Sequence, residues 1–236
     1  TVHAGSVDEA DDQVGVAHML EHLAFYSHGG DTLDARQRLL KAGWQQGRHF
    51  NAVTSYERTQ YLLSPPNGVK STELALQTLA TMAFAADFTA DDLQRERPIV
   101  IEEWRGGLGV AQRMNAKRTA AQRTGSRYPA HRTIGNRQAI EQAQLSALQA
   151  FQQRWYLPGN MVLNVVGDFE PQQIIAQIEQ AFAKPQRGQV PSREYLELPL
   201  DDKLKVFRVQ DSQSGSNQMA LLFRFQQLDS REQTVA

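Results

Sequence analysis

The sequence predicts an α+β domain in which a mixed, mainly antiparallel β-sheet carries helices packed on one side. Two strand-like segments, near residues 49–55 and 58–64, are close enough to form a hairpin. Several longer segments have the apolar periodicity of amphipathic helices. Strands and helices do not follow one another in the regular alternation that a doubly wound parallel sheet requires.

The first helix is predicted over residues 11–26, where the Asp11-Asp12 pair favours the positive end of the helix dipole. A second helix follows Asp31-Thr32 and runs to about residue 42, with Gly43 as its stop signal. The hairpin comes next and is closed by Pro65-Pro66. These elements place the first helix and the hairpin close together in sequence.

The remaining chain is predicted to hold further helices and strands. Pro98 lies inside the helix predicted over 89–104, where it removes one backbone hydrogen bond. A kink is therefore expected in that helix. The Arg-rich residues 106–136 are interpreted as a solvated surface. The predicted helices are 69–86, 89–104, 138–154 and 171–183, and the predicted strands are 161–166, 204–210 and 218–226.

Composition limits the possible functions. The chain has 236 residues, is 41% hydrophobic and carries a formal net charge of −1, which gives no electrostatic case for binding nucleic acid. No apolar run is long enough to span a membrane. The chain has no cysteine, so a zinc ion would have to be held by histidines and carboxylates.

The domain organisation is predicted from the same features. We expect an N-terminal domain over residues 1–190, followed at 191–236 by a linker with closing strands or by the start of a second, related domain. The chain opens at Thr1 without a methionine and stops soon after a strand-like segment. We therefore expect it to be part of a longer protein.

The segment His18-Met-Leu-Glu21-His22 carries the strongest functional signal. Positions four residues apart lie on one face of a helix, so both imidazoles can reach one metal ion. Glu21 lies close enough to that ion to handle a proton. The order H-x-x-E-H is the reverse of the commoner zinc-protease motif and is termed inverzincin. It predicts zinc-assisted hydrolysis.

A catalytic zinc takes three protein ligands and keeps a fourth position for water. The third ligand is a carboxylate or another histidine. The remaining histidines each stand alone in their segments, whereas the predicted helix over 89–104 carries Glu96, Glu102 and Glu103. Glu96 and Glu103 share a face of that helix, about 10 Å apart. Glu102 points about 100° away from Glu103, so the two cannot serve one site.

Several segments together resemble the pitrilysin or insulinase family. The first is His18-Met-Leu-Glu-His-Leu-Ala-Phe25, which is followed some eighty residues later by Glu96-Arg-Pro-Ile-Val-Ile-Glu-Glu103. The others lie on both sides of these two and extend the resemblance over nearly the whole chain: Gly5-Ser6 with Gly15, Phe50-Asn-Ala-Val-Thr-Ser55, Tyr128-Pro129 with Ile134-Gly135, and 156–169.

The resemblance implies a domain like that of the mitochondrial processing peptidase, with one Zn²⁺ per chain. It implies His18, His22 and Glu103 as the metal ligands, and Glu21 as the general base of a metalloendopeptidase. Glu96 matches the earlier glutamate of the family's segment. The resemblance implies that Glu96 supports the site without being a metal ligand. Pro98 lies between the two glutamates, and the gap from His22 to Glu103 is longer than in the family, so Glu102 stays a fallback ligand.

The resemblance also implies a peptide substrate in an extended conformation, aligned along the strand at 49–55 by Asn51 and the backbone of Ala52. Members of the family enclose substrate between two related halves, and the second half contributes to the site. We therefore expect this chain to need the remaining half of its polypeptide, or a partner subunit, and to cleave peptides poorly alone. The resemblance favours a periplasmic location.

Two alternatives differ in class from a peptidase. A non-catalytic family member would keep the fold and act as a scaffold or peptide-binding subunit, although the retained Glu21 argues against this role. An α+β binding module would carry the two histidines incidentally and would bind no zinc.

Overall fold

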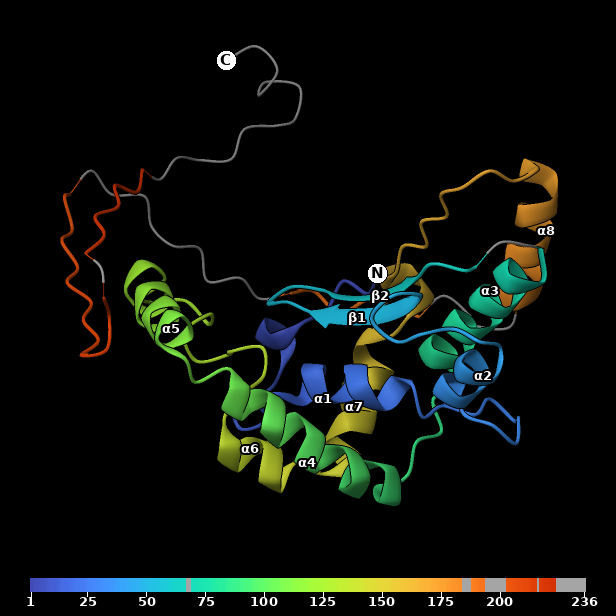
Figure 1. The fold of residues 1–236 in the computed structure, drawn as a ribbon, viewed down its shortest axis with the longest axis horizontal. Coiled ribbons are helices and arrows are strands. Elements are labelled where there is room, and N and C mark those ends of the chain that lie inside the picture. The colour runs from blue at the N-terminus through green and yellow to red at the C-terminus, as the bar shows by residue number, and fades with distance from the viewer. Residues whose placement is uncertain (67–68, 184–187, 194–202, 216, 224–236) are drawn as a thin grey trace, which may run out of the picture. The chain divides into compact units, whose positions relative to one another are not determined.

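The computed structural model describes residues 1–66, 69–183, 188–193, 203–215 and 217–223 (Figure 1). The chain divides into two compact units. The first contains residues 1–106 and 130–193, and the second contains residues 107–129 and 194–236. The predicted domain boundary at residue 190 stays a prediction. Among the described residues, no helix combines the length and the apolar character that crossing a membrane would need.

The first unit is an α+β structure, as predicted. Among its described residues the sheet is an antiparallel hairpin, and the short 3-10 helices are η1 (Ser6–Asp8) and η2 (Pro158–Asn160). The helices and strands are α1 (Val16–Ala24), α2 (Ala35–Lys41), β1 (Phe50–Thr54), β2 (Thr59–Leu63), α3 (Val69–Phe84), α4 (Ala90–Gly106), α6 (Arg137–Gln142), α7 (Leu145–Trp155) and α8 (Pro171–Phe182).

The hairpin pairs Phe50 with Leu63 at one end and Thr54 with Thr59 at the other. Val2 extends this small sheet, because it bridges both Thr59 and Met161. The strand predicted over 161–166 is thus reduced to one bridge at its first residue. Helix α1 packs against β1 and β2, and Figure 1 shows it on one side of the hairpin.

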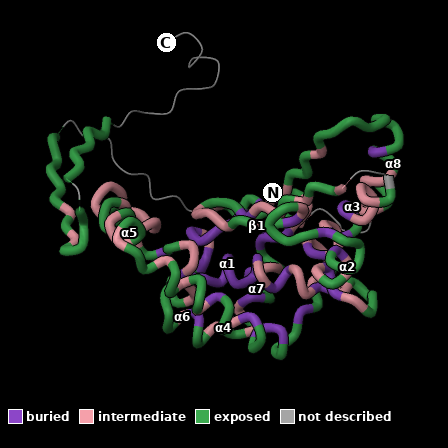
Figure 2. Tube along the Cα trace, viewed as in Figure 1, coloured by how far each residue is buried: buried purple, intermediate pink, exposed green. Residues whose placement is uncertain are grey.

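Helix α1 lies at the centre of the core. All but one of its nine residues are buried, and it packs against α4, α7 and the hairpin (Figure 2). Helix α7 contributes Leu148, Phe151 and Trp155 to the same core. Burial on nearly all sides explains why so short a helix is stable, since tertiary packing supplies most of helical stability in proteins.

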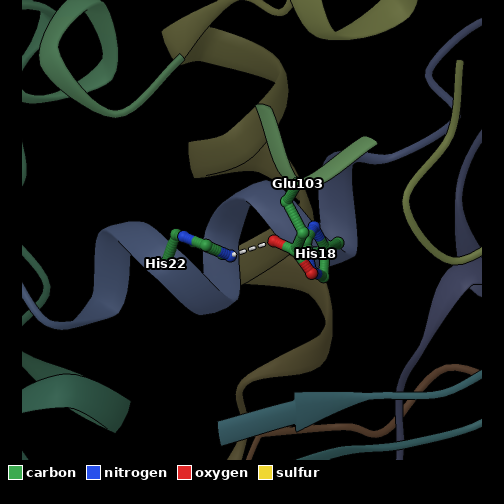
Figure 3. A group of neighbouring side chains, drawn as sticks. All are labelled: His18, His22 and Glu103. Atoms are coloured by element: carbon green, nitrogen blue, oxygen red, sulfur yellow. Dashed lines mark ion pairs between the residues drawn. The ribbon is translucent and has the colours of Figure 1, made fainter. Parts of the chain in front are cut away.

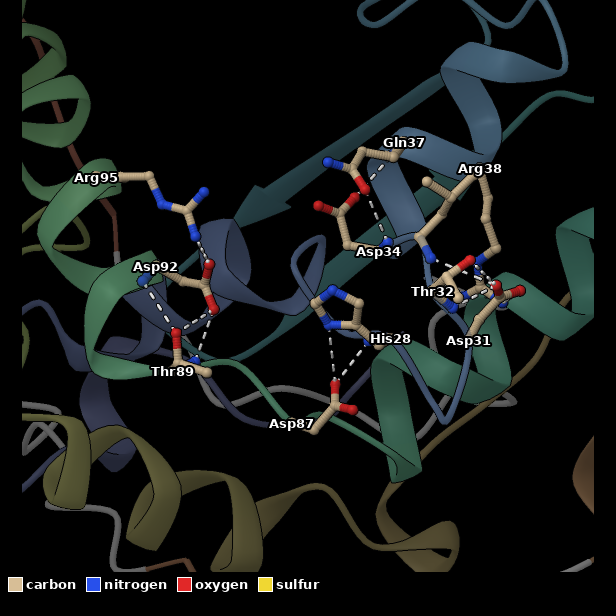
Figure 4. A network of polar contacts seen from close by, with 11 residues as sticks. His28, Asp31, Thr32, Asp34, Gln37, Arg38, Asp87, Thr89, Asp92 and Arg95 are labelled. Atoms are coloured by element: carbon tan, nitrogen blue, oxygen red, sulfur yellow. Dashed lines mark hydrogen bonds and ion pairs between the residues drawn. The ribbon is translucent and has the colours of Figure 1, made fainter.

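Two helices begin later than the sequence predicts. Helix α1 begins at Val16 instead of residue 11, because Gly15 takes a left-handed conformation with φ of 89°. Helix α2 begins after Asp34, not after Asp31-Thr32. The carboxylate of Asp34 accepts a hydrogen bond from the backbone amide of Gln37, and the side-chain Oε1 of Gln37 accepts one from the backbone amide of Asp34 (Figure 4).

Helix α4 runs without interruption from Ala90 to Gly106 through Pro98. Thr89 and Asp92 cap its start, since the hydroxyl and amide of Thr89 both donate to the Asp92 carboxylate (Figure 4). The helix predicted over 138–154 is broken into α6 and α7. Arg97 of α4 donates to the carbonyls of Ile140 and Ala143, which satisfies backbone acceptors at the end of α6.

The second unit contains α5 (Val110–Gln122), a helix that the sequence does not predict. None of its residues is buried, which agrees with the predicted solvated character of the segment. Within this unit Arg113 forms an ion pair with Asp211 at 2.8 Å. Residues 203–215 and 217–223 form no strand, so the predictions of 204–210 and of 218–223 are wrong. Residues 224–226 of the second predicted strand lie outside the described residues.

Candidate metal centre

Helix α1 presents both predicted imidazole ligands on one face. His18 and His22 are one turn apart, and their ring centroids are separated by 4.8 Å. His18 is buried, whereas the side chain of His22 is 20% exposed. The apolar residues on the other faces of α1 are buried in the core. They leave the two histidines facing α4.

Glu103 reaches this pair from the last part of α4. Its carboxylate oxygens lie 3.5 Å from Nε2 of His18 and 3.3 Å from Nε2 of His22. The three potential ligand atoms all lie within 4.8 Å of one another. Figure 3 shows the three side chains converging from the two helices. The structure thus brings together the three residues that the sequence predicts as ligands.

The spacing of these atoms fits a zinc ion. In a tetrahedral site with metal–ligand distances near 2.1 Å, neighbouring ligand atoms are about 3.4 Å apart. The two His–Glu103 separations, 3.5 Å to Oε1 and 3.3 Å to Oε2, are close to that edge, and one ligand atom from each residue lies within 4.8 Å of the others. The two separations are longer than a charge-assisted hydrogen bond, which is about 2.7–2.9 Å. Two imidazoles and one carboxylate are also a known catalytic zinc ligand set.

Glu96 lies two turns nearer the start of α4 than Glu103 and contacts one of the candidate ligands. It is 4% exposed, and its Oε1 lies 2.7 Å from Nδ1 of His22. The hydroxyl of Tyr26 donates to its other oxygen at 2.6 Å. A carboxylate on the second ring nitrogen fixes the tautomer and direction of a metal-binding histidine. By contrast, Nδ1 of His18 is buried without a hydrogen-bond partner among the described residues.

The two carboxylates and His22 strongly perturb one another. Burial opposes protonation of His22, but its contacts with Glu103 and Glu96 outweigh burial and raise the pKa of the imidazole to about 9. Contacts with His18 and His22 hold the pKa of the Glu103 carboxyl well below its usual value. Burial and the contact with Glu96 raise the pKa of Tyr26 to about 12. In the absence of metal, the raised pKa favours the protonated imidazole of His22, which lies between the two carboxylates.

Glu21 lies on α1 next to the ligands and is buried. The hydroxyl of Thr54, at the end of β1, donates to its Oε2. Sequence reasoning did not identify Thr54 as a site residue. The signal for it is the two-residue alternation of β1, where Phe50, Ala52 and Thr54 are less exposed than Asn51 and Val53.

Tyr26 was also missed, although it follows His22 by four residues and so belongs to the same helical repeat. The fallback ligand Glu102 is turned away from the histidines. Its side chain is 67% exposed and forms an ion pair with Arg105. Asn51 and Ala52 lie on β1 as predicted, with Asn51 exposed. Their roles in substrate binding stay predictions.

Comparison with known proteins identifies the family. Residues 1–128 match the family model described as insulinase (peptidase family M16), and residues 142–236 match the model of the peptidase M16 inactive domain. The first match covers more than half of the chain and contains every residue of the candidate site. The chain belongs to the insulinase family of zinc metallopeptidases, which confirms the resemblance drawn from the sequence.

Individual relatives agree. The chain is 33% identical over 187 residues to the probable zinc protease PqqL of Haemophilus influenzae, covering 78% of this chain and 20% of that protein. Among solved structures, the ferredoxin protease FusC in complex with Arabidopsis ferredoxin is 46% identical with a TM-score of 0.86, over 91% of this chain and 24% of that chain. The chain therefore spans about a fifth to a quarter of these relatives.

A further structure, the first half of the periplasmic protease PqqL from Escherichia coli, is 28% identical with a TM-score of 0.77. The likeness covers 82% of this chain and 42% of that half. These likenesses support the predicted α+β fold class independently of the small hairpin that the described residues form.

Proposed function

We propose that this chain provides the zinc-binding portion of a metalloendopeptidase that hydrolyses peptides or small unfolded proteins. The observation that carries the proposal is the convergence of His18, His22 and Glu103, whose potential ligand atoms all lie within 4.8 Å of one another and form a known catalytic zinc ligand set. His18 and His22 would supply imidazole ligands from α1, and Glu103 a carboxylate from α4. One zinc ion per chain would occupy the site.

Zinc in this site would lower the pKa of a coordinated water from about 15.7 toward 7 and polarise the scissile carbonyl. Glu21 is assigned as the general base, which takes a proton from that water and later gives it to the leaving amine. Its neighbour Thr54 donates a hydrogen bond to one carboxylate oxygen and leaves the other for the proton. Glu96 would hold the His22 ring in the direction that presents Nε2.

The substrate is proposed to lie extended along β1. Among the described residues, positions 51–54 of β1 pair only with β2, so a peptide can add along their other edge by backbone hydrogen bonds. Asn51 and the backbone of Ala52 would contribute to that alignment. Thr54, at the end of the same strand, contacts Glu21. This contact links the proposed binding strand to the proposed base.

The remaining half of the same polypeptide, or a partner subunit, is proposed to complete the site. Because the chain spans only a fifth to a quarter of the relatives compared, we expect it to bind zinc but to cleave peptides poorly alone. A periplasmic location is proposed, and one neighbour at 28% identity is a periplasmic protease.

A non-catalytic, peptide-binding role is the second candidate. The match of residues 142–236 to the model of an inactive domain favours it. That match lies outside residues 1–128, which contain the candidate ligands and base. The metalloendopeptidase is therefore the better supported function.

The decisive experiment compares the full-length protein with its Glu21→Gln variant. Zinc content by mass spectrometry and cleavage of fluorogenic peptides are measured on both. We expect one zinc per chain in both proteins and peptide cleavage only in the wild type. Zinc without cleavage in the wild type would favour the non-catalytic role, and turnover by the variant would reject Glu21 as the base. A wild type without zinc would favour the incidental binding module.

A further inference from the structure

The helix that carries the two histidines cannot cap its own start. Its N-cap residue is Gly15, whose φ of 89° is unfavourable for any residue with a side chain. A Cβ at this position would also lie 3.1 Å from the carbonyl oxygen of Ile134 and 3.3 Å from Cα of Gly135. The close approach of these two backbone segments excludes the serine, threonine or aspartate that usually caps a helix.

A buried carboxylate from outside the helix takes over this role. Oε2 of Glu9 accepts a hydrogen bond from the amide of Gly15 at 2.9 Å, and Oε1 accepts one from the amide of Ala17 at 2.8 Å. Glu9 is 2% exposed. Both of its oxygens are thus used on backbone donors that the first turn of a helix leaves without intrahelical partners.

The surroundings of Glu9 show that its carboxylate is specifically accommodated. His131, 1% exposed, places Nδ1 at 3.8 Å from Oε2 of Glu9 and Nε2 at 3.0 Å from a carboxylate oxygen of Asp11. The backbone carbonyl of His131 accepts a hydrogen bond from the buried hydroxyl of Ser6. A buried carboxylate is tolerated only where hydrogen bonds and an opposite charge compensate it.

We propose that Glu9 is a positioning residue for the metal centre, through its control of the first turn of α1. This inference rests on the proposed zinc site. His18 is the third residue of α1 and directly follows Ala17, whose amide Glu9 holds. Loss of the cap would let this first turn fray, and the imidazole of His18 would lose its fixed direction. His22, one turn further on, would be less affected.

The test compares two losses of a capping carboxylate in the full-length protein. Glu9→Ala removes the cap of α1, and Asp34→Ala removes the cap of α2, which carries no proposed ligand. Zinc dissociation constants are measured by competition with a chelator, and unfolding temperatures are measured without metal. We expect both variants to unfold at lower temperature, but only Glu9→Ala to weaken zinc binding, by about tenfold or more.

Three further measurements support the comparison. Glu9→Gln keeps one acceptor oxygen and should bind zinc with an affinity between those of wild type and Glu9→Ala. Substitution of Co²⁺ for zinc should give a changed visible spectrum in Glu9→Ala and an unchanged one in Asp34→Ala. Hydrogen exchange of the metal-free wild type should show protected amides at Gly15 and Ala17, which needs no variant to fold.

Several outcomes would overturn the proposal. Wild-type zinc affinity in both Glu9 variants would do so, as would an equal loss of affinity in Asp34→Ala. Unprotected amides at Gly15 and Ala17 would remove its structural basis. A wild type with no zinc affinity would reject the proposed function itself, and the role of Glu9 with it. These results are distinguishable, because only the last one concerns the wild type's binding of zinc.

Discussion

Nδ1 of His22 lies 2.7 Å from Oε1 of Glu96, while Nε2 of the same ring faces Glu103 at 3.3 Å. One imidazole is therefore held between two carboxylates of α4 that are seven residues apart. The two residues are separated by two helical turns, about 10 Å along the axis of α4. Their carboxylates converge on the two nitrogens of the His22 ring, so both matched glutamates of the family segment contact the same histidine.

Removal of Glu96 is predicted to weaken zinc binding without removing a ligand. Glu96→Ala takes away the acceptor of the His22 ring and of the Tyr26 hydroxyl, so His22 loses its fixed tautomer and direction. We expect the zinc dissociation constant to rise by about 10–100-fold, as measured by chelator competition. Tyr26→Phe removes only one contact to Glu96 and should have a smaller effect. Equal zinc affinity in Glu96→Ala and wild type would contradict the proposal that Glu96 stabilises His22 as a ligand.

Thr54 is predicted to matter for turnover and not for zinc. Thr54→Val keeps the shape of the side chain but removes the hydroxyl that donates to Glu21. We expect kcat of the full-length protein to fall about tenfold, because a general base acts only when it is correctly placed. Zinc content and KM should change little. Thr54→Ser restores the donor and should recover most of the activity, and a fully active valine variant would exclude the role.

Neutral variants of Glu103 and Glu102 can show which of the two is the metal ligand. Glu103→Gln replaces an anionic ligand with a weaker neutral one, and we expect zinc affinity to fall by more than the about 10–100-fold that loss of an outer-shell partner costs. Glu102→Gln should bind zinc as the wild type does, because the exposed side chain of Glu102 contacts Arg105 instead of the histidines. The reverse result, a loss of zinc only in Glu102→Gln, would shift the ligand assignment by one residue.

The local parts of the structure were predictable from sequence. The four-residue spacing of His18 and His22 depends only on helical geometry, and the alternation along 49–64 depends only on strand geometry. The helices observed at 69–84 and 171–182 also match their predictions closely. Each of these elements packs part of its surface against another element of the first unit, so the apolar pattern indicates the local structure.

Features that depend on distant contacts were not predictable from the residues alone. Helix α5 has no buried face, and therefore no periodic signal marks it. The true start of α1 depends on the approach of Gly135 to Gly15 across more than a hundred residues. Likewise, residue types alone did not decide which of Glu96, Glu102 and Glu103 is the third metal ligand. Resemblance to the family selected Glu103, and the fold then placed it beside His18 and His22.

The metal-free protein is predicted to lose stability as pH rises through the neutral range. The pKa of His22 is raised from 6.5 to about 9 in the folded state. Below about pH 6.5 folded and unfolded states both carry this proton, and the stabilisation is fully present. Between pH 6.5 and about 9 only the unfolded state loses the proton, so the stabilisation declines. The lowered pKa of Glu103 does not alter this window, because its carboxylate is ionised in both states there.

Thermal unfolding in the presence of a chelator at pH 6, 7.5 and 9 measures this effect. The unfolding temperature of the wild type should fall across the series, and His22→Gln should flatten the fall because the titrating group is gone. Bound zinc has the opposite effect on the pH dependence of stability. Its ligands must be deprotonated, so the affinity for zinc increases with pH. The zinc-loaded protein should accordingly gain stability relative to the metal-free protein as pH rises. A metal-free wild type that is equally stable at pH 6 and 9 would show that His22 carries no proton between Glu96 and Glu103.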